Sequence, residues 1–308
     1  MPLVSVVMNC LDSERYLREA IDSVYAQTHS DWEIVFVDNG SRDASPRVAK
    51  SYNSRLRYLR NDQTVALGRA RNQALQAARG ELICFLDCDD RWLAHKLARQ
   101  IAFLHAHPRV EFLHSNFYFI DARGRRTATG YRRQQPDGQV FGNFLRHFEL
   151  NLQTVMVRKP ALERLDELFD ATLSLAEDYD LFMRLLHDAE LGYIHEPLAE
   201  YRVHSEQNTA RFPKRFGEEM QICFDKLRRK FPDIERVHAA ELGYLAGKVA
   251  YWKARGAMAQ GTTAEARALL APYRGSNWHF GALYLLTYLG PGIWHALHAL
   301  RYHTGRMS

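Results

Sequence analysis

The sequence predicts an α/β protein in which a mainly parallel central sheet is followed by a helical extension. Over the first ninety residues, short apolar runs typical of buried strands alternate with segments whose apolar residues recur every three or four positions. The run Leu82–Leu86 is apolar throughout and leads directly into three carboxylates between Asp87 and Asp90, as expected for a central strand of a parallel sheet. After about Phe212 only helical periodicity remains. This order of elements predicts right-handed strand–helix–strand units and therefore a doubly wound sheet.

Local signals support each element of the first part of the chain. The segment from Ser45 is a good helix start, because a hydroxyl can cap the first turn and Pro46 needs no backbone partner there. Gly80 is expected to end the third helix as its C′ residue. The expected strands are Val4–Met8, Trp32–Val37, Leu56–Leu59 and Leu82–Leu86, and the expected helices are the segment around Leu17–Tyr25, the segment from Ser45, and Leu67–Arg79.

Composition excludes several classes of protein. With 46% hydrophobic and 25% charged residues, the 308-residue chain is typical of a folded globular protein and too rich in apolar residues to be disordered. Its four cysteines have neither metal-finger spacing nor the density of a small secreted scaffold, and no basic segment with a cleavage site precedes the first strand. A cytoplasmic protein with reduced thiols is therefore expected. The net charge of +5 includes no concentrated basic block, so no nucleic-acid partner is expected.

Polar side chains follow three different strands of the expected sheet. Asn9, Asp38 and Asp87 each come just past the carboxyl end of a strand, so the fold should bring them to one rim, where open α/β sheets bind ligands. Asp87 and Asp89 are suited to a hard divalent cation. Such a cation would neutralise a diphosphate, while Asp38 could accept a hydrogen bond from a base or a ribose. Arg71, early in a helix, adds a cationic donor. Each residue also has a purely structural alternative: a polar loop, a turn, or a surface ion pair.

Taken together, these motifs resemble those of the family 2 glycosyltransferases with the GT-A fold, over about the first 210 residues. The resemblance implies transfer of a sugar from a nucleotide diphosphate donor. It also implies that Asp38 contacts the base, that Arg71 lies near the donor, and that Asp87 and Asp89 serve the ribose, the diphosphate and a Mn²⁺ or Mg²⁺ ion. One departure is Leu11, at a position where the family often has an aromatic residue, which makes a uridine nucleotide less secure. The motifs that carry the resemblance, in order, are Val4–Met8, Tyr16–Thr28, Val37–Asp43, Ala70–Asn72 and Phe85–Asp90.

A second acidic motif begins another expected helix. Its buried stripe is Leu181, Phe182, Leu185 and Leu186, which puts Glu177 and Asp178 in the first turn. Carboxylates there are commonly favoured by the helix dipole alone. Inverting sugar transfer, however, needs a base for the acceptor hydroxyl. The pair matches the family's E-D motif, so Asp178 is the expected base and Glu177 the residue that orients the acceptor.

Further along, the sequence offers weaker site candidates. His204, in the segment Tyr201–His204, matches a motif common in the family and is expected near the diphosphate or the metal, although a lone histidine after a strand is more often structural. Gln153 is an acceptor-side candidate. The basic stretch from Arg123 to Gly142 has no period and is expected to form a long loop. A helix is expected over Trp92–Ala106, and strands over Val110–Leu113 and Phe117–Ile120.

The C-terminal part is expected to form its own helical region, so that residues 1–211 form the catalytic domain and 212–308 the extension. The segment 281–300 contains no charged residue, but Gly290-Pro291-Gly292 interrupts it. Two short apolar helices are therefore expected instead of one membrane-spanning helix. They would either pack on the domain or give peripheral contact with a membrane through 281–306.

The sequence thus predicts an inverting, metal-dependent glycosyltransferase at the cytoplasmic face of a membrane. Its expected partners are a nucleotide-sugar donor, UDP-linked by preference, and a glycan or lipid-linked acceptor in the synthesis of a surface polysaccharide or another glycan. A nucleotidyltransferase would carry a glycine-rich basic loop after the first strand, where Asn9–Ser13 has none. A non-catalytic scaffold with the same fold is the other alternative, and the intact acidic motifs argue against it.

Overall fold

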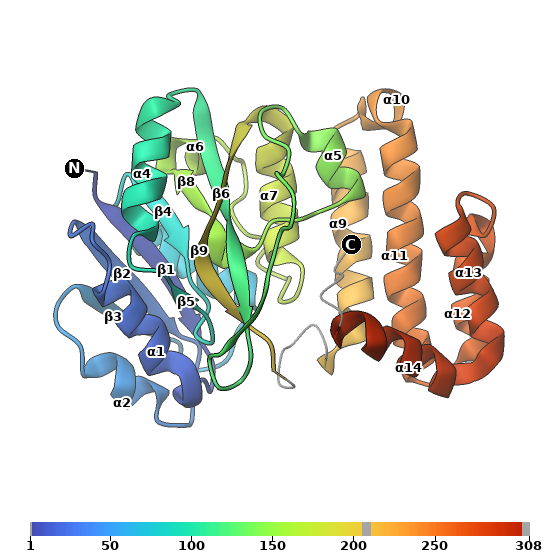
Figure 1. Ribbon diagram of the computed structural model, residues 1–308, viewed down its shortest axis with the longest axis horizontal. Coiled ribbons are helices and arrows are strands. Elements are labelled where there is room, and N and C mark those ends of the chain that lie inside the picture. The colour runs from blue at the N-terminus through green and yellow to red at the C-terminus, as the bar shows by residue number, and fades with distance from the viewer. Residues whose placement is uncertain (1, 205–210, 304–308) are drawn as a thin grey trace. The chain divides into compact units, whose positions relative to one another are not determined.

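The computed structural model describes residues 2–204 and 211–303 (Figure 1). Its contacts divide the chain into two compact units. The first unit contains the chain up to Val140 together with Glu149–His204, and the second contains Phe141–Phe148 together with the chain after His204.

A nine-stranded sheet organises the first unit. Four parallel strands form one side, in the order β3-β2-β1-β4, and the sheet continues through β8, β6, β9 and β5, with β7 paired to β6. The parallel strands are β1 (Val4–Cys10), β2 (Trp32–Asp38), β3 (Leu56–Arg60) and β4 (Leu82–Phe85). Helices α1 (Glu14–Tyr25), α2 (Ser45–Lys50) and α3 (Leu67–Ala77) connect them. The predicted alternation of strands and helices is confirmed here.

Beyond β4 the sheet becomes mixed. Strand β8 (Met156–Arg158) is antiparallel to β4 and to β6 (Val110–Ile120), which runs parallel to β9 (Glu190–Arg202). The two strands predicted at Val110–Leu113 and Phe117–Ile120 are one strand, because β6 pairs with β9 across shifts of register that local patterns do not reveal. The remaining elements are β5 (Arg91–Trp92), α4 (Lys96–Ala106), β7 (Arg126–Thr129), η1 (Leu152–Thr154), α6 (Lys159–Glu163) and α7 (Glu177–Asp188).

Several other local predictions were wrong. The helix expected from Trp92 starts at Lys96, because Arg91 and Trp92 pair with β9. The expected loop from Arg123 contains β7, which forms a hairpin with β6. The Ser45 hydroxyl does not cap its helix but accepts a hydrogen bond from the Ser13 amide at 3.0 Å.

Gly80 has a different role from the predicted one. It is not among the residues with positive φ, and α3 ends in an extended Ala78. A Cβ on Gly80 would lie 2.5 Å from the backbone nitrogen of Ser5 and 2.8 Å from the carbonyl oxygen of Leu3. Glycine is therefore needed for the close approach of the chain to β1, where it enters β4.

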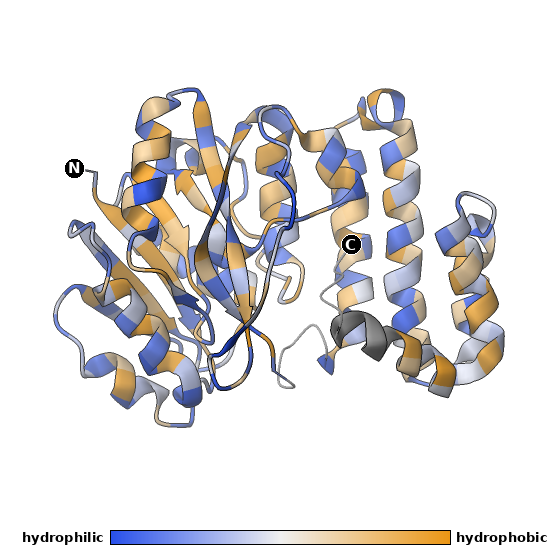
Figure 2. Cartoon of the chain, in the orientation of Figure 1, coloured by the Kyte–Doolittle hydropathy of each residue, from blue (hydrophilic) through white to orange (hydrophobic). Residues whose placement is uncertain are grey.

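The second unit is helical. It consists of α5 (Phe141–Arg146), α9 (Pro213–Lys230), α10 (Ile234–Val237), α11 (Ala239–Ala259), α12 (Thr263–Leu270), η2 (Ala271–Tyr273), α13 (Trp278–Leu286), η3 (Thr287–Leu289) and α14 (Gly290–His303). The predicted break in the uncharged tail is confirmed, because Gly290, which follows η3 and begins α14, adopts φ +81°. Among the described residues, no helix is both long enough and apolar enough to cross a membrane. Figure 2 shows hydrophobic residues along α12 and α13.

Candidate active site

The carboxyl ends of the parallel strands bring the predicted polar residues to one rim. Asn9 pairs in register with Val37, so it lies beside Asp38 at the ends of β1 and β2, and Asp87 follows β4 on the other side of β1. The side-chain amide of Asn9 is buried and has no hydrogen-bond partner among the described residues. Such a group is costly unless a ligand or water satisfies it, so Asn9 stays a candidate contact for a ligand at this rim.

Arg71 joins two of the predicted motifs. Its guanidinium is buried, with 5% of the side chain exposed, and donates one hydrogen bond to Asp87 Oδ1 at 2.9 Å and another to Glu177 Oε1. Asp87 remains 39% exposed, whereas Glu177 is buried. The structure therefore brings the expected donor rim and the first turn of α7 together around one cation.

The loop before α7 holds α3 in place and so fixes this meeting point. The amide of Asn72 donates to the carbonyl of Phe169 at 2.8 Å and accepts from the Phe169 backbone amide at 2.9 Å. The Gly68 amide donates to the carbonyl of Leu173 at 3.0 Å. A Cβ on Gly68 would lie 2.0 Å from the carbonyl oxygen of Asp170, so only glycine permits this contact.

Burial and charge perturb the acidic pair at the start of α7. Burial raises the pKa of Glu177 to about 7, although Arg71 opposes the shift. Burial also raises the pKa of Asp178 above its ordinary value, against the same guanidinium. A carboxylate with a raised pKa is a stronger base than an exposed one, which suits it to accept a proton near neutral pH.

Asp89 and His204 form the second predicted cluster of the rim. His204 Nε2 lies 2.9 Å from Asp89 Oδ2. Arg202, buried on β9, donates from Nε to the Asp89 carbonyl at 2.7 Å, and its backbone amide donates to Asp90 Oδ1 at 2.7 Å. An imidazole nitrogen and carboxylate oxygens form a donor set that suits Mn²⁺ and, through its oxygens, Mg²⁺. These donor types suit the predicted metal, but Asp87, Asp89 and His204 do not form a group whose ligand atoms lie within 4.8 Å of one another; among the described residues, Glu167, Asp170 and Asp180 do.

Asp38 is placed at the rim but is closed off from solvent. Its side chain is 0% exposed, because the Tyr58 hydroxyl and Arg60 Nη1 donate to Oδ2 and the Ser41 amide donates to Oδ1. Although burial favours the protonated acid, these donors hold the pKa of Asp38 below its ordinary value. In this arrangement the carboxylate has no exposed surface through which a nucleoside base could reach it, whereas the Arg60 side chain beside it is 40% exposed.

Tyr58 and Arg60 were not predicted as site residues. Their role depends on strand register: Tyr58 and Arg60 lie two positions apart on β3, so their side chains face the same way, and Arg60 pairs in register with Asp38 of β2. Neighbours in a parallel sheet whose side chains face the same way meet directly.

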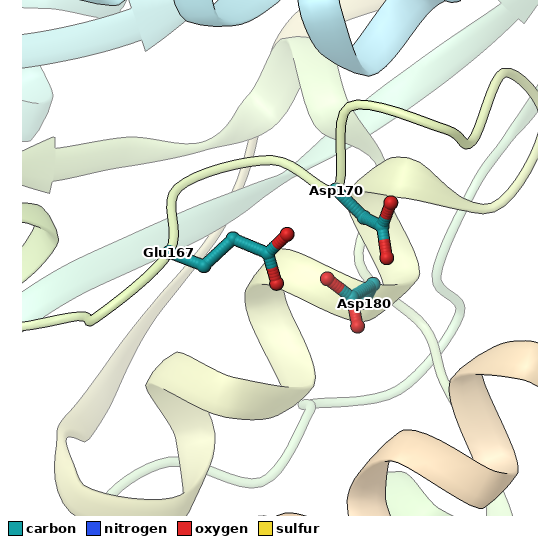
Figure 3. A group of neighbouring side chains, drawn as sticks. All are labelled: Glu167, Asp170 and Asp180. Carbon is teal, nitrogen blue, oxygen red and sulfur yellow. The ribbon is translucent and has the colours of Figure 1, made fainter.

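Another acidic cluster lies outside the predicted site. Carboxylate oxygens of Glu167, Asp170 and Asp180 lie within 4.8 Å of one another (Figure 3). The buried guanidinium of Arg184 supplies positive charge there, since it contacts Asp180 at 2.7 Å and the carbonyls of Glu167 and Leu168. Asp180 and Arg184 form an ion pair four positions apart on α7, and the hydrogen bonds from Arg184 to the two carbonyls stabilise the loop that leads into this helix. Gln153, the weaker candidate, is buried in η1, where its carbonyl accepts a hydrogen bond from the Trp92 indole.

The chain combines a parallel sheet, which has acidic motifs at its carboxyl rim, with a mixed part of the same sheet and a second acidic motif at the start of α7. This combination is that of the GT-A class of glycosyltransferase. Residues 5–164 match the sequence model of the family described as glycosyl transferase family 2. The chain belongs to this family and is a glycosyltransferase, as the motifs predicted.

Relatives and a solved structure agree with this assignment. The uncharacterized glycosyltransferase MJ1057 of Methanocaldococcus jannaschii is 31% identical over 67% of this chain and 73% of its own length. The UDP-Glc:alpha-D-GlcNAc-diphosphoundecaprenol beta-1,3-glucosyltransferase WfgD of Escherichia coli is 29% identical over 62% of this chain and 73% of its own. The mannosyltransferase PcManGT from Pyrobaculum calidifontis, solved with GDP-Man and Mn²⁺, shares the fold with a TM-score of 0.61. It is 22% identical, and the likeness covers 99% of this chain and 84% of that one.

Proposed function

We propose that this enzyme transfers a sugar from a nucleotide diphosphate sugar to an acceptor hydroxyl with inversion, supported by a divalent metal ion. The observation that carries the proposal is the buried Arg71, which links Asp87 at the expected donor rim to Glu177 beside Asp178. One cation thereby fixes the spacing between a donor-binding carboxylate and a pair of carboxylates suited to acid–base work.

Each residue has a distinct role in this reaction. Asp178 takes the proton from the acceptor hydroxyl as that oxygen attacks the sugar carbon, and Glu177 orients the acceptor. Asp87, Asp89 and His204 hold the metal, which when bound neutralises charge on the leaving diphosphate. Asn9, whose amide has no partner among the described residues, forms a hydrogen bond with the nucleotide-sugar. Asp38 lies behind Arg60, near the nucleoside base of that substrate.

Donor and acceptor are proposed from what the names of the relatives say. WfgD acts on a UDP-linked donor and a lipid-linked acceptor, and PcManGT was solved with GDP-Man and Mn²⁺. We expect UDP-sugars first, GDP-sugars second, and a glycan or lipid-linked acceptor in polysaccharide synthesis. The proposed place of work is the cytoplasmic face of a membrane.

Two substitutions test the assigned roles. Asp89→Asn should weaken Mn²⁺-supported binding of UDP-glucose or GDP-mannose, with partial recovery at higher Mn²⁺. Asp178→Asn should leave donor and metal affinity near wild type but slow release of the nucleoside diphosphate by roughly 10²–10⁴, the usual contribution of a positioned base. Calorimetric titration and nucleotide-release assays on the same preparations measure both effects.

Asp188→Asn, at the exposed far end of the same helix, is the matched control and should change neither quantity. A normal rate for Asp178→Asn would remove it as the base. Failure of the wild-type protein to bind either donor with Mn²⁺ would contradict the proposed function as a whole.

A further inference from the structure

The helices at the end of the second unit expose an unusual number of large apolar side chains. Among the described residues, twelve such side chains are exposed, and six of them lie within 278–297. These six residues, which we call the outer apolar face, are Trp278, Leu285, Tyr288, Leu289, Ile293 and Leu297. Large exposed apolar patches on soluble proteins commonly mark interaction sites.

Helix α13 is apolar on both of its sides. Phe280 points into the unit and is 4% exposed. Trp278 and Leu285 are separated by seven positions, so they share one side of the helix, opposite Phe280, and are 74% and 65% exposed. Asn277 fixes this orientation, because its side chain caps the helix by accepting from the Phe280 amide at 3.0 Å. Core packing therefore accounts for one side of α13 and leaves the other unexplained.

The same division continues through η3 and α14. Thr287 and Trp294 are each 1% exposed, and Trp294 packs with the core formed by α11 and α12. Ile293 and Leu297, four positions apart on α14, remain exposed. The two helices and the turn between them contact one another, so their exposed residues are close neighbours at this end of the unit.

Charge around this face favours an anionic partner. Residues 275–300 contain no charged side chain, and 242–308 contain one acidic residue, Glu265, against seven lysines and arginines. Arg267 lies over the ring of Tyr288 at 3.7 Å, and Arg274 lies over that of Tyr284 at 5.6 Å. Apolar and aromatic side chains bordered by arginines are the composition expected at an anionic lipid interface.

We propose that the outer apolar face docks the enzyme on an anionic lipid bilayer, with α13 and α14 lying in the interface. No described helix can cross a membrane, so the contact is peripheral. The sequence predicted membrane contact through 281–306. This inference places the contact on the exposed sides of α13, η3 and α14, beginning at Trp278. Residues 304–306 of the predicted segment lie outside the described part of the chain. Sugar transfer by the first unit does not depend on this inference.

Substitutions on the exposed side test the proposal in the full chain. Wild type should co-sediment with vesicles of phosphatidylcholine and phosphatidylglycerol, and less with phosphatidylcholine alone. Leu285→Glu together with Leu289→Glu should lower binding by roughly tenfold or more, because both apolar contact and charge complementarity are lost. The thermal midpoint should stay near wild type, since both side chains are already in solvent.

Ile222→Glu together with Val237→Glu is the matched control, because these residues are also exposed and apolar but lie on α9 and α10. This control should bind vesicles like wild type. Equal binding by the Leu285/Leu289 variant, or no binding by wild type, would overturn the proposal. A third outcome would also overturn it. If wild type is a dimer in sedimentation velocity, and the Leu285/Leu289 variant is a monomer that still binds vesicles, the face serves a second copy of the chain.

Discussion

Arg71 shows how one buried side chain can set both the geometry and the protonation of a site. Its guanidinium is planar and donates in two directions, so it reaches Asp87 and Glu177 at once. A lysine at this position would provide charge without that fork. The arginine opposes the rise in the pKa of both Glu177 and Asp178, so burial and charge act against each other in this part of the site.

The raised carboxylate pKa values predict opposite pH dependences for activity and stability. The base, Asp178, must be ionised, and burial raises its pKa above the ordinary value, so as the pH is lowered kcat/KM should begin to fall at a higher pH than an ordinary aspartate would give. The folded protein binds more protons than the unfolded chain between the ordinary and the raised pKa. Its free energy of unfolding should therefore decrease as pH rises through that window.

Rate profiles and urea unfolding between pH 5 and pH 8 on one preparation give both slopes. Glu177→Gln serves as the control, because removing its negative charge should lower the pKa of Asp178 and shift the acid limb of the rate profile to lower pH. An acid limb that stays in place would mean that the two carboxylates are not coupled.

The sequence predicted those site residues whose position follows from their neighbours in the chain, and it missed contacts between residues far apart in the chain. Asp87, Asp89 and the Glu177–Asp178 pair follow strand ends or begin a helix, so local pattern placed them. The direct contact of Arg71 with Glu177 joins residues 106 positions apart, and no periodicity encodes it. The contacts of Tyr58 and Arg60 with Asp38 depend on strand register, which local sequence patterns do not determine.

At the scale of the elements, helix α3 is positioned by its contact with the loop before α7, which the sequence of α3 alone does not predict. Gly68 and Asn72 face the loop before α7, and the loop is itself stabilised by Arg184. Gly68 reads as a poor helix former in isolation, yet any side chain there would meet the Asp170 carbonyl. Long β6 and the non-capping Gly80 were mispredicted for the same reason, since each depends on a neighbour distant in sequence.

This contact predicts that Gly68→Ala is destabilising although alanine favours helices. The added Cβ should push α3 from the loop and cost about 1–3 kcal/mol, as overpacking does. Because α3 also carries Arg71, activity should fall with stability. Gly243→Ala is the matched control: it lies in α11 with nothing within 4 Å of the new Cβ, and should stabilise by up to about 1 kcal/mol. Thermal and urea unfolding measure the two signs, and the same sign for both would contradict the packing argument.

At the scale of the whole molecule, the two units are interleaved in sequence. Helix α5 comes from between two segments of the first unit but groups with the second. Its apolar residues Phe141, Phe144 and Leu145 are buried, and Phe141 packs edge-on against Phe231 and His238. The Lys248 ammonium also donates to the Arg146 carbonyl at 3.1 Å. The part of the chain predicted as the catalytic domain, 1–211, therefore contains a helix whose partners lie beyond it.

A chain that ends at His204 should consequently fold with an exposed apolar helix. Removing α9 to α14 uncovers the packing side of α5, so the shortened chain should bind the dye ANS and self-associate where the full chain does not. Phe141→Ser together with Phe144→Ser in the shortened chain should reduce both effects, because both rings are large, apolar and buried in the full chain. Dye fluorescence and sedimentation velocity of the three proteins check this. If the shortened chain is monomeric and binds no dye without the serine substitutions, α5 finds its apolar partners within the first unit, and the division of the chain into these two units is not the one by which it folds.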